Sequence, residues 1–476
     1  MSRLLISAAH KSSGKTTISV GLCSALTQRG LMVQAFKKGP DYIDPMWLSQ
    51  ASGRACFNLD PYLMSHAQIT SGFAAHSKQA DISIVEGNKG LYDGLALDGS
   101  NSNAALAKLL NLPVVLVLDA RGMTRGIAPL ILGYQAFDPA IHIAGVILNN
   151  VGGTRHESKL RAVIEHYTDV EVLGAIGYDT QLAVTERHLG LMPNHEIDNA
   201  AQRIKAMGSL IATGVNLDCL LAVANLNVKP LPADVARIVS DKPVTQSRSM
   251  ERQNKKDLRI GIAQDKAFGF YYQDDLLAFE NAGAELVSFD TLIDKSLPKV
   301  DGVFIGGGFP EMFMPELEAN QTMRSQIKQA IEEGMPVYAE CGGLMYLARS
   351  IRWNDKCFDM VGALPADVHM HNKPIGRGYV ELETTANMPW ASQGADAVAN
   401  VTVKGHEFHY SSLENMAPEM RYAYRVKRGH GADGEHDGLL VKNVLASYSH
   451  LHQNASSQWV TQFVDFVREI KKGRMQ

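Results

Sequence analysis

This chain lacks cysteines spaced in sequence as disulfide or metal-binding pairs. Its five cysteines (Cys23, Cys56, Cys219, Cys341 and Cys357) are odd in number, widely spaced and without a C-x-x-C motif. This pattern excludes a disulfide framework and the usual zinc ligand spacing. It is typical of a protein that works in a reducing compartment, and we expect a cytoplasmic location.

Long apolar runs and one-sided charge are also lacking. The longest apolar run, LPVVLVLDA at 112–120, falls well short of the roughly 20 residues that cross a bilayer. No basic leader precedes the first apolar run, so we expect no signal peptide. The net charge of −4, from 46 basic and 50 acidic residues, gives no basic patch for nucleic acid or an anionic membrane. We therefore expect small-molecule partners, with a homodimer as one assembly to test.

The 476 residues exceed what one hydrophobic core usually supports, so at least two domains are expected. In the first half, short Val-, Ile- and Leu-rich runs alternate with longer segments compatible with helices, which predicts parallel strands in βαβ units. The predicted strands are 3–9, 31–37, 82–87, 114–120, 143–151 and 170–177.

A polar, charged, Pro-containing stretch at 227–257 is typical of a linker. We therefore predict domains at 1–226 and 258–476. The α/β alternation restarts after the linker, and the later segments 378–385, 401–410 and 422–429 alternate like strands. The second domain should be a mixed sheet. The last segment places Trp459, Phe463, Val467 and Ile470 on one helical face, which favours a core-packed helix over a membrane-binding tail.

The segment LLISAAHKSSGKTT at 4–17 resembles a phosphate-binding loop, although Ala9 stands at its first Gly position. It lies between a predicted strand and a predicted helix, where backbone N–H groups and the helix dipole bind phosphates. Ala9 is tolerable there only if its φ is negative. Lys15 should contact the ATP phosphates, and Thr16 should bind Mg²⁺.

Carboxylates at two other strand ends supply the remaining metal ligands. Glu86 ends the run DISIVEG, and Asp41 and Asp44 follow the second strand. Because the carboxyl ends of parallel strands meet at one edge of the sheet, we expect Asp44 and Glu86 to join Thr16 at a Mg²⁺ site.

A second chemical cluster surrounds Cys341, which directly follows the apolar strand PVYAE and precedes two glycines and a helix. This arrangement predicts a nucleophile elbow, and the helix dipole should lower the pKa of the thiol. Backbone N–H groups of Gly306, Gly307 and Gly308, together with that of Gly342, are candidates for an oxyanion hole. The candidate bases are His406, His409, His450 and His452.

Many long motifs, in order, resemble the cobyrinic acid a,c-diamide synthase family. They include FKKGPDYIDP, VEGNKGLYDG, GVILNNVGGTRH, ERHLGLMP, YAECGGLMYL and GHEFHYS. The resemblance covers nearly the whole chain. It implies an α/β protein of two doubly wound domains: a P-loop NTPase-like, dethiobiotin-synthetase-like ATP-binding domain and a flavodoxin-like class I glutamine amidotransferase domain.

The resemblance also implies roles for residues. Cys341 would be the nucleophile and His450 its base, with Gly307, Gly308 and Gly342 in the oxyanion hole. The acid that most class I amidotransferases carry two residues after the histidine is replaced by His452, so a Cys–His pair is expected. The remaining candidates are the ATP-site residues Ser13, Gly14, Lys15, Thr16, Thr17 and Asn149, the metal ligands Thr16, Asp44 and Glu86, and the substrate-side residues Lys37, Asp41, Tyr42 and Asp93.

The implied reaction is ATP- and glutamine-dependent amidation of the a and c carboxylates of a tetrapyrrole, with cobyrinate as the first expectation. Sirohaem or nickel sirohydrochlorin is the alternative substrate, because the residues at His10 to Ser13 depart from the usual family loop. A regulatory or positioning P-loop ATPase with a degenerate amidotransferase module is the alternative of another class. That alternative predicts a lysine at position 10, where this chain has His10.

Overall fold

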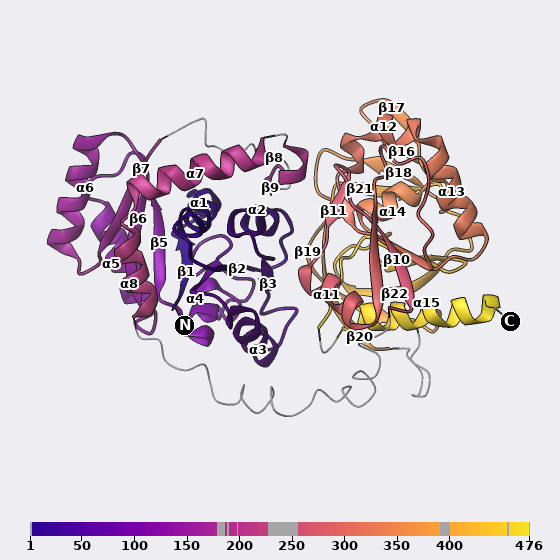
Figure 1. Cartoon of the computed structure of the whole chain (residues 1–476), viewed down its shortest axis with the longest axis horizontal. Helices are drawn as coiled ribbons and strands as arrows, with labels where there is room; N and C mark the ends of the chain where they lie inside the picture. Colours follow the sequence, from indigo (N-terminus) through magenta and orange to yellow (C-terminus); the bar gives the residue numbers. More distant parts are fainter. Residues whose placement is uncertain are drawn as a thin grey trace. The chain divides into compact units, whose positions relative to one another are not determined.

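The computed structural model of the chain describes residues 2–178, 186–187, 190–197, 199–226, 256–390, 400–454 and 457–475. It divides into two compact units, 1–243 and 244–476 (Figure 1). Nearly all of the predicted linker at 227–257 lies outside the described residues. The exact domain boundaries therefore stay a prediction.

The N-terminal unit contains a seven-stranded parallel sheet of order β3-β2-β4-β1-β5-β6-β7. All six predicted strands are present, because continuous apolar runs are buried on both faces of a parallel sheet. In this sheet only the short strand β3 was not predicted, and a separate two-stranded sheet of β8 (Glu186–Arg187) and β9 (Gly190–Leu191) was not predicted either. The strands are β1 (Ser2–Ala8), β2 (Val33–Lys38), β3 (Phe57–Leu59), β4 (Ile82–Glu86), β5 (Val114–Asp119), β6 (Ile143–Val151) and β7 (Val172–Gly177).

Helices cover both faces of this sheet, as a doubly wound fold requires. One face packs Leu5, Phe36 and Leu116 against apolar residues of four helices, α3 to α6. On the other face, α1 and α7 lie side by side (Figure 1). The helices are α1 (Lys15–Gln28), α2 (Ile43–Ser52), α3 (His66–Ser77), α4 (Asn103–Leu110), α5 (Ile127–Phe137), α6 (Thr154–Tyr167), α7 (Ala200–Gly214) and α8 (Leu217–Asn225).

The C-terminal unit contains a nine-stranded sheet of order β12-β10-β13-β15-β24-β23-β22-β19-β20. Its first five strands are parallel, and in chain order they read 2-1-3-4-5, the flavodoxin-like arrangement. The other four strands add an antiparallel edge, which confirms the predicted mixed sheet. The strands are β10 (Leu258–Ala263), β12 (Ala284–Phe289), β13 (Gly302–Ile305), β15 (Val337–Glu340), β19 (Gly376–Thr384), β20 (Thr402–His409), β22 (Arg421–Arg428), β23 (His436–Val441) and β24 (Val444–Ser447).

Two smaller sheets of this unit were not predicted, because their strands are short and lack a clear alternation. One pairs β11 (Phe268–Phe270) with β14 (Gly307–Gly308), and the other has the order β17-β16-β18-β21. Its strands are β16 (Ser350–Trp353), β17 (Lys356–Asp359), β18 (Asp367–Met370) and β21 (Ser411–Glu414). The helices of the unit are α11 (Gln273–Asn281), α12 (Met314–Ala319), α13 (Gln321–Glu332), α14 (Gly342–Leu347) and α15 (Trp459–Met475).

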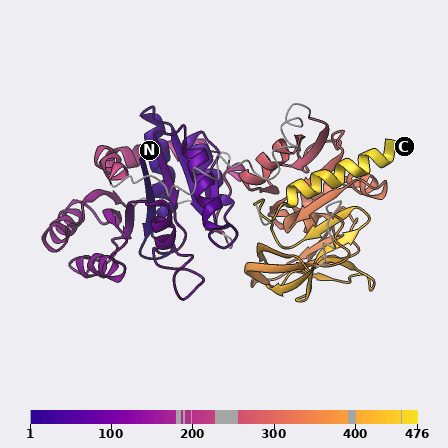
Figure 2. The ribbon, with the colours of Figure 1, turned by 90° about the horizontal axis from the view of Figure 1, so that it is seen from below.

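The last helix, α15, lies along the C-terminal unit (Figure 2, yellow). Trp459, Phe463 and Val467 are buried in the core between this helix and the sheet. The predicted core-packed helix is therefore confirmed in place of a membrane-binding tail. Among the described residues, no helix is both long and apolar enough to cross a membrane.

Candidate active sites

The phosphate-binding loop connects β1 to α1, as predicted. Gly14 caps α1 with φ 86°, and Lys15 is the first residue of the helix. A side chain at Gly14 would meet Nδ2 of Asn149 at 2.2 Å, so both the backbone angle and the space require glycine. Asn149 Nδ2 in turn donates to the Ser13 carbonyl over 2.9 Å. This contact fixes the loop against the end of β6.

Of the substituted loop positions, Ser12 has a left-handed backbone angle with φ 60°. Ala9 is not among the residues with positive φ. The negative φ that an alanine needs at this position of the loop is therefore present. The buried Ser13 hydroxyl donates to the His10 carbonyl over 2.8 Å, which closes the turn. Burial and the neighbouring Lys37 ammonium lower the pKa of Lys15 to about 8. A bound phosphate would favour the charged form of this lysine.

Thr16, Asp44 and Glu86 lie together at the carboxyl edge of the sheet. The Thr16 hydroxyl is 2.7 Å from Oε1 of Glu86 and 3.2 Å from Oδ2 of Asp44. The Lys37 ammonium pairs with both carboxylates and lies 2.9 Å from Glu86 Oε1. Lys37, predicted on the substrate side, therefore lies among the predicted metal ligands.

These residues fit a magnesium ion. Glu86 is completely buried, and its Oε2 atom has no hydrogen-bond partner. Burial raises the pKa of Glu86 to about 7, although the Lys37 ammonium opposes the shift. An unsatisfied buried carboxylate oxygen beside a second carboxylate and a hydroxyl is the oxygen donor set that Mg²⁺ prefers. Thr16, Asp44 and Glu86 would hold the ion.

The other substrate-side candidates lie on loops around this cluster. Asp41 accepts a hydrogen bond from the Asp44 backbone N–H at 3.0 Å, and the buried Tyr42 is the N-cap residue of α2. Asp93 accepts from the Gly90 N–H at 2.8 Å, in the loop after β4.

Sequence reasoning missed the residue that shapes the loop after β4. The buried Asn103 side chain donates to the Asn88 and Gly90 carbonyls and accepts from the Asn88 N–H. A buried amide with local backbone partners has no sequence motif, so the sequence offered no signal for Asn103.

Cys341 occupies a strained elbow. It follows β15 and precedes α14, with φ 45° and ψ −99°, a backbone conformation that a residue other than glycine rarely adopts. Its N–H donates to the Ser447 carbonyl of the adjacent strand β24 over 2.7 Å. The predicted strand-to-helix turn is therefore present, and the strain marks a functional position.

The thiol differs from the sequence prediction in its acidity. Burial, together with the Glu311 carboxylate, raises the pKa of Cys341 well above its ordinary value, whereas the Gly342 N–H opposes the shift. The N–H group at the start of α14 does lower this pKa, but burial outweighs it, so the net direction is opposite to the predicted one. The nucleophile therefore needs a base.

The glycines around Cys341 bring two loops together. A side chain at Gly342 would meet the Gly308 backbone N at 3.0 Å, and one at Gly307 would meet Cε1 of His450 at 2.6 Å. Gly306 is not free to serve in the oxyanion hole, because its N–H donates to the Tyr271 hydroxyl over 3.0 Å. Gly307, Gly308 and Gly342 stay the predicted donors.

His450 lies beside the nucleophile's strand. It follows β24, which pairs in parallel with β15 so that Ser447 lies opposite Glu340. Nδ1 of His450 is 3.4 Å from Oε2 of Glu340, the residue directly before Cys341. Although the position two residues after the histidine holds no acid, an acid from another strand lies against the ring.

The remaining candidate histidines have other partners. His452 Nε2 lies 3.2 Å from Oδ2 of Asp274, and His409 Nδ1 lies 2.8 Å from the Ser411 carbonyl. His406 stacks on His450 with ring centroids 4.8 Å apart. Burial and the nearby His450 lower the pKa of His406 well below its ordinary value. Among the four histidines, His450 alone faces both Gly307 and Glu340.

A buried carboxylate that no sequence motif marks fixes the turn leading to His450. Asp437 on β23 accepts hydrogen bonds from the Ser447 hydroxyl at 2.7 Å and from the Tyr448 and Ser449 N–H groups at 3.0 Å each. It is completely buried. These bonds fix the turn from within the fold.

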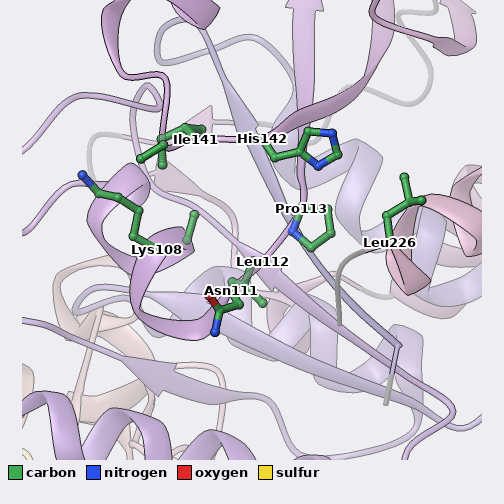
Figure 3. A pocket seen from close by; sticks show the side chains of 9 residues that line it. Lys108, Asn111, Leu112, Pro113, Ile141, His142 and Leu226 are labelled. Atoms are coloured by element: carbon green, nitrogen blue, oxygen red, sulfur yellow. The ribbon is translucent and has the colours of Figure 1, made fainter. Parts of the chain in front are cut away.

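A pocket of about 240 Å³ lies elsewhere in the N-terminal unit (Figure 3). Pro113 and His142, which line it, directly precede β5 and β6. The pocket is therefore at the amino edge of the sheet, whereas the phosphate loop and carboxylates are at the carboxyl edge. Open α/β sheets bind ligands at the carboxyl edge, so we assign the pocket no role.

Comparisons with known proteins match the domains that carry both clusters. Residues 5–191 match the CobQ/CobB/MinD/ParA nucleotide binding domain, and residues 259–458 match the CobB/CobQ-like glutamine amidotransferase domain. A cobyrinate a,c-diamide synthase of Magnetococcus marinus is 44% identical over 98% of this chain and 97% of its own length. Proteins of the same name from Methanosarcina acetivorans (41% identical, 99% and 96% covered) and Listeria monocytogenes (38%, 95% and 96%) are also similar. The chain therefore belongs to the cobyrinate a,c-diamide synthase family.

Proposed function

We propose that this chain is a glutamine-hydrolysing ligase that converts the a and c carboxylates of cobyrinate into carboxamides, using ATP. The observation that carries the proposal is the presence, in one chain, of a fixed phosphate loop with a carboxylate cluster and of a strained cysteine elbow beside a histidine. An acyl phosphate explains why both belong together. ATP activates the substrate carboxylate, and the thiol releases from glutamine the ammonia that replaces the phosphate.

The first half-reaction belongs to the N-terminal unit. Lys15 and the loop N–H groups bind the ATP phosphates, and the substrate carboxylate attacks the γ-phosphorus, which releases ADP and leaves an acyl phosphate. Mg²⁺, held by Thr16, Asp44 and Glu86, would neutralise phosphate charge. Lys37, which pairs with Asp44 and Glu86 in this structure, is a cation within reach of the same region.

The second half-reaction belongs to the C-terminal unit. His450 accepts the thiol proton as Cys341 attacks the glutamine amide carbon, and backbone N–H groups of Gly307, Gly308 and Gly342 stabilise the oxyanion. Collapse of this intermediate releases ammonia and leaves a glutamyl thioester, which water hydrolyses to glutamate. Ammonia then displaces phosphate from the acyl phosphate and forms the amide.

The substrate is assigned from the relatives, since the similar proteins from Magnetococcus marinus, Methanosarcina acetivorans and Listeria monocytogenes carry the name cobyrinate a,c-diamide synthase. Sirohaem, the alternative raised by the residues at His10 to Ser13, has no such support. A regulatory P-loop ATPase with a degenerate amidotransferase module is also disfavoured, because Cys341 and His450 lie in an ordered, buried arrangement.

One experiment tests the proposal. The purified chain is given ATP, Mg²⁺ and glutamine with either cobyrinate or sirohaem, and mass spectrometry follows replacement of each carboxylate OH by NH₂, together with ADP release. We expect amidation of cobyrinate only. ADP release and amidation with sirohaem but not with cobyrinate would overturn the substrate assignment, and no product with either would overturn the function.

The Cys341→Ala variant tests the division of labour between the units. We expect loss of glutamine-dependent amidation and retention of amidation with added ammonia. Loss of both activities would contradict the division. The cytoplasmic location and the homodimer stay predictions, which cell fractionation and analytical ultracentrifugation would test.

A further inference from the structure

We propose that Glu340, the residue directly before the nucleophile, is the positioning acid of His450 and takes the role of the missing acid after the histidine. This inference rests on the proposed glutaminase function of Cys341 and His450. It places the acid on β15, the strand that precedes Cys341, rather than on the segment after β24 that carries His450.

The Glu340 carboxylate is held in one orientation. Its Oε1 atom accepts hydrogen bonds from the Tyr338 hydroxyl at 2.8 Å and from the Leu451 N–H at 2.9 Å. Its Oε2 atom is the one that lies 3.4 Å from Nδ1 of His450. Because Leu451 directly follows His450, the same carboxylate accepts a hydrogen bond from the backbone of this segment and lies beside its ring.

Burial makes the contact chemically effective. The side chains of Glu340 and His450 are 2% and 4% exposed, so water screens their interaction very little. A carboxylate beside Nδ1 selects the tautomer that carries its proton there and leaves Nε2 as the base. The same negative charge stabilises the imidazolium that forms when the ring accepts the thiol proton.

Other titratable groups around His450 are either neutral or paired elsewhere. His406 stacks on the ring, and its lowered pKa leaves it neutral. Asp274 pairs with His452 at 3.2 Å, and Asp275 accepts the Gln453 N–H at 2.7 Å. The carboxylate that lies against the His450 ring itself is that of Glu340.

The test compares Glu340→Gln with a matched control, Asp274→Asn, which alters the neighbouring carboxylate–histidine pair. In the complete assay, we expect Glu340→Gln to lower kcat with glutamine by about 100-fold, within the range of general base catalysis. The KM for glutamine and the ammonia-dependent activity should stay unchanged. Asp274→Asn should keep wild-type glutamine use.

A conservative replacement separates a positioning role from a structural one. Glu340→Asp, which keeps the charge, should recover part of the kcat with glutamine that Glu340→Gln loses, and it should keep the wild-type KM for glutamine. If Glu340→Gln does not fold, Glu340→Asp decides, since a raised KM for glutamine or an equal loss of ammonia-dependent activity in this variant would overturn the proposal.

Several results would overturn the inference. They are unchanged kcat in Glu340→Gln, an equal loss of glutamine- and ammonia-dependent activity, or the same loss in Asp274→Asn. Failure of the proposed function is distinct, because the wild-type chain would then not use glutamine at all.

Discussion

The Nζ atom of Lys37 lies 2.9 Å from Oε1 of Glu86, and both side chains are buried. Burial lowers the pKa of Lys37, but the carboxylates of Asp44 and Glu86 outweigh it and raise this pKa well above its ordinary value. The lysine therefore stays charged and neutralises two carboxylates that would otherwise repel each other.

Removal of this cation should destabilise the N-terminal unit. Lys37→Met leaves two buried carboxylates unpaired, so we expect the free energy of unfolding to fall by about 3–5 kcal/mol. Urea unfolding measures the change. The control Lys108→Met removes an exposed ion pair with Asp138 and should cost no more than about 1 kcal/mol. Equal effects of the two variants would contradict the assignment, and adding Glu86→Gln to Lys37→Met should restore part of the stability.

Nucleotide binding should depend on Gly14 in a way that backbone strain alone does not explain. Gly14→Ala combines a left-handed backbone angle with a contact of 2.2 Å to Asn149, whereas Gly30 has nearly the same φ (85°) and nothing within 4 Å of a new Cβ. Both variants should lose about 1–3 kcal/mol of stability from strain. Gly14→Ala alone should lose ATP binding in calorimetry, and retained binding would contradict the assigned loop.

Glutamine use should depend on Gly307. A Cβ atom there would lie 2.6 Å from Cε1 of His450, so Gly307→Ala should displace the ring and lower glutamine-dependent turnover by at least about tenfold. Ammonia-dependent amidation should be unaffected. Gly473→Ala, in open space on α15, is the control and should leave both activities at the wild-type level. Wild-type glutamine turnover in Gly307→Ala would count against His450 as the base.

Alkylation of Cys341 should report its raised pKa. In the free protein, the rate of reaction with iodoacetamide should keep rising as pH passes the ordinary thiol pKa of about 8.5, because burial disfavours the thiolate. Mass spectrometry of the Cys341 peptide measures the rate, and the exposed Cys357 provides an internal reference. A plateau below pH 8 would show that the thiol is acidic, as the helix dipole argument predicted.

The strands of the N-terminal sheet could be predicted because apolar runs such as 114–118 are buried on both faces and need no alternation. Cys341 could be selected because a strand end, two glycines and a helix follow one another in the sequence. The phosphate loop could be selected for the same reason. In each case, the residues that reveal the site are neighbours in the chain.

The parts that could not be predicted join distant segments. Glu340 and Leu451 are 111 positions apart, and only the pairing of β15 with β24 brings them together. Asp437 and Asn103 act through backbone hydrogen bonds that leave no pattern in the sequence. The sign of the Cys341 pKa shift depends on burial, which the local sequence does not specify.

The hydrogen bonds of Asp437 have a consequence for the free energy of substrate binding. Tyr448 and Ser449 are fixed by this buried carboxylate, which is itself part of the fold. Ordering a backbone residue costs about 1–2 kcal/mol of conformational entropy. Because the fold orders this turn, glutamine binding does not have to order it. More of the interaction energy with glutamine therefore remains available to stabilise the transition state.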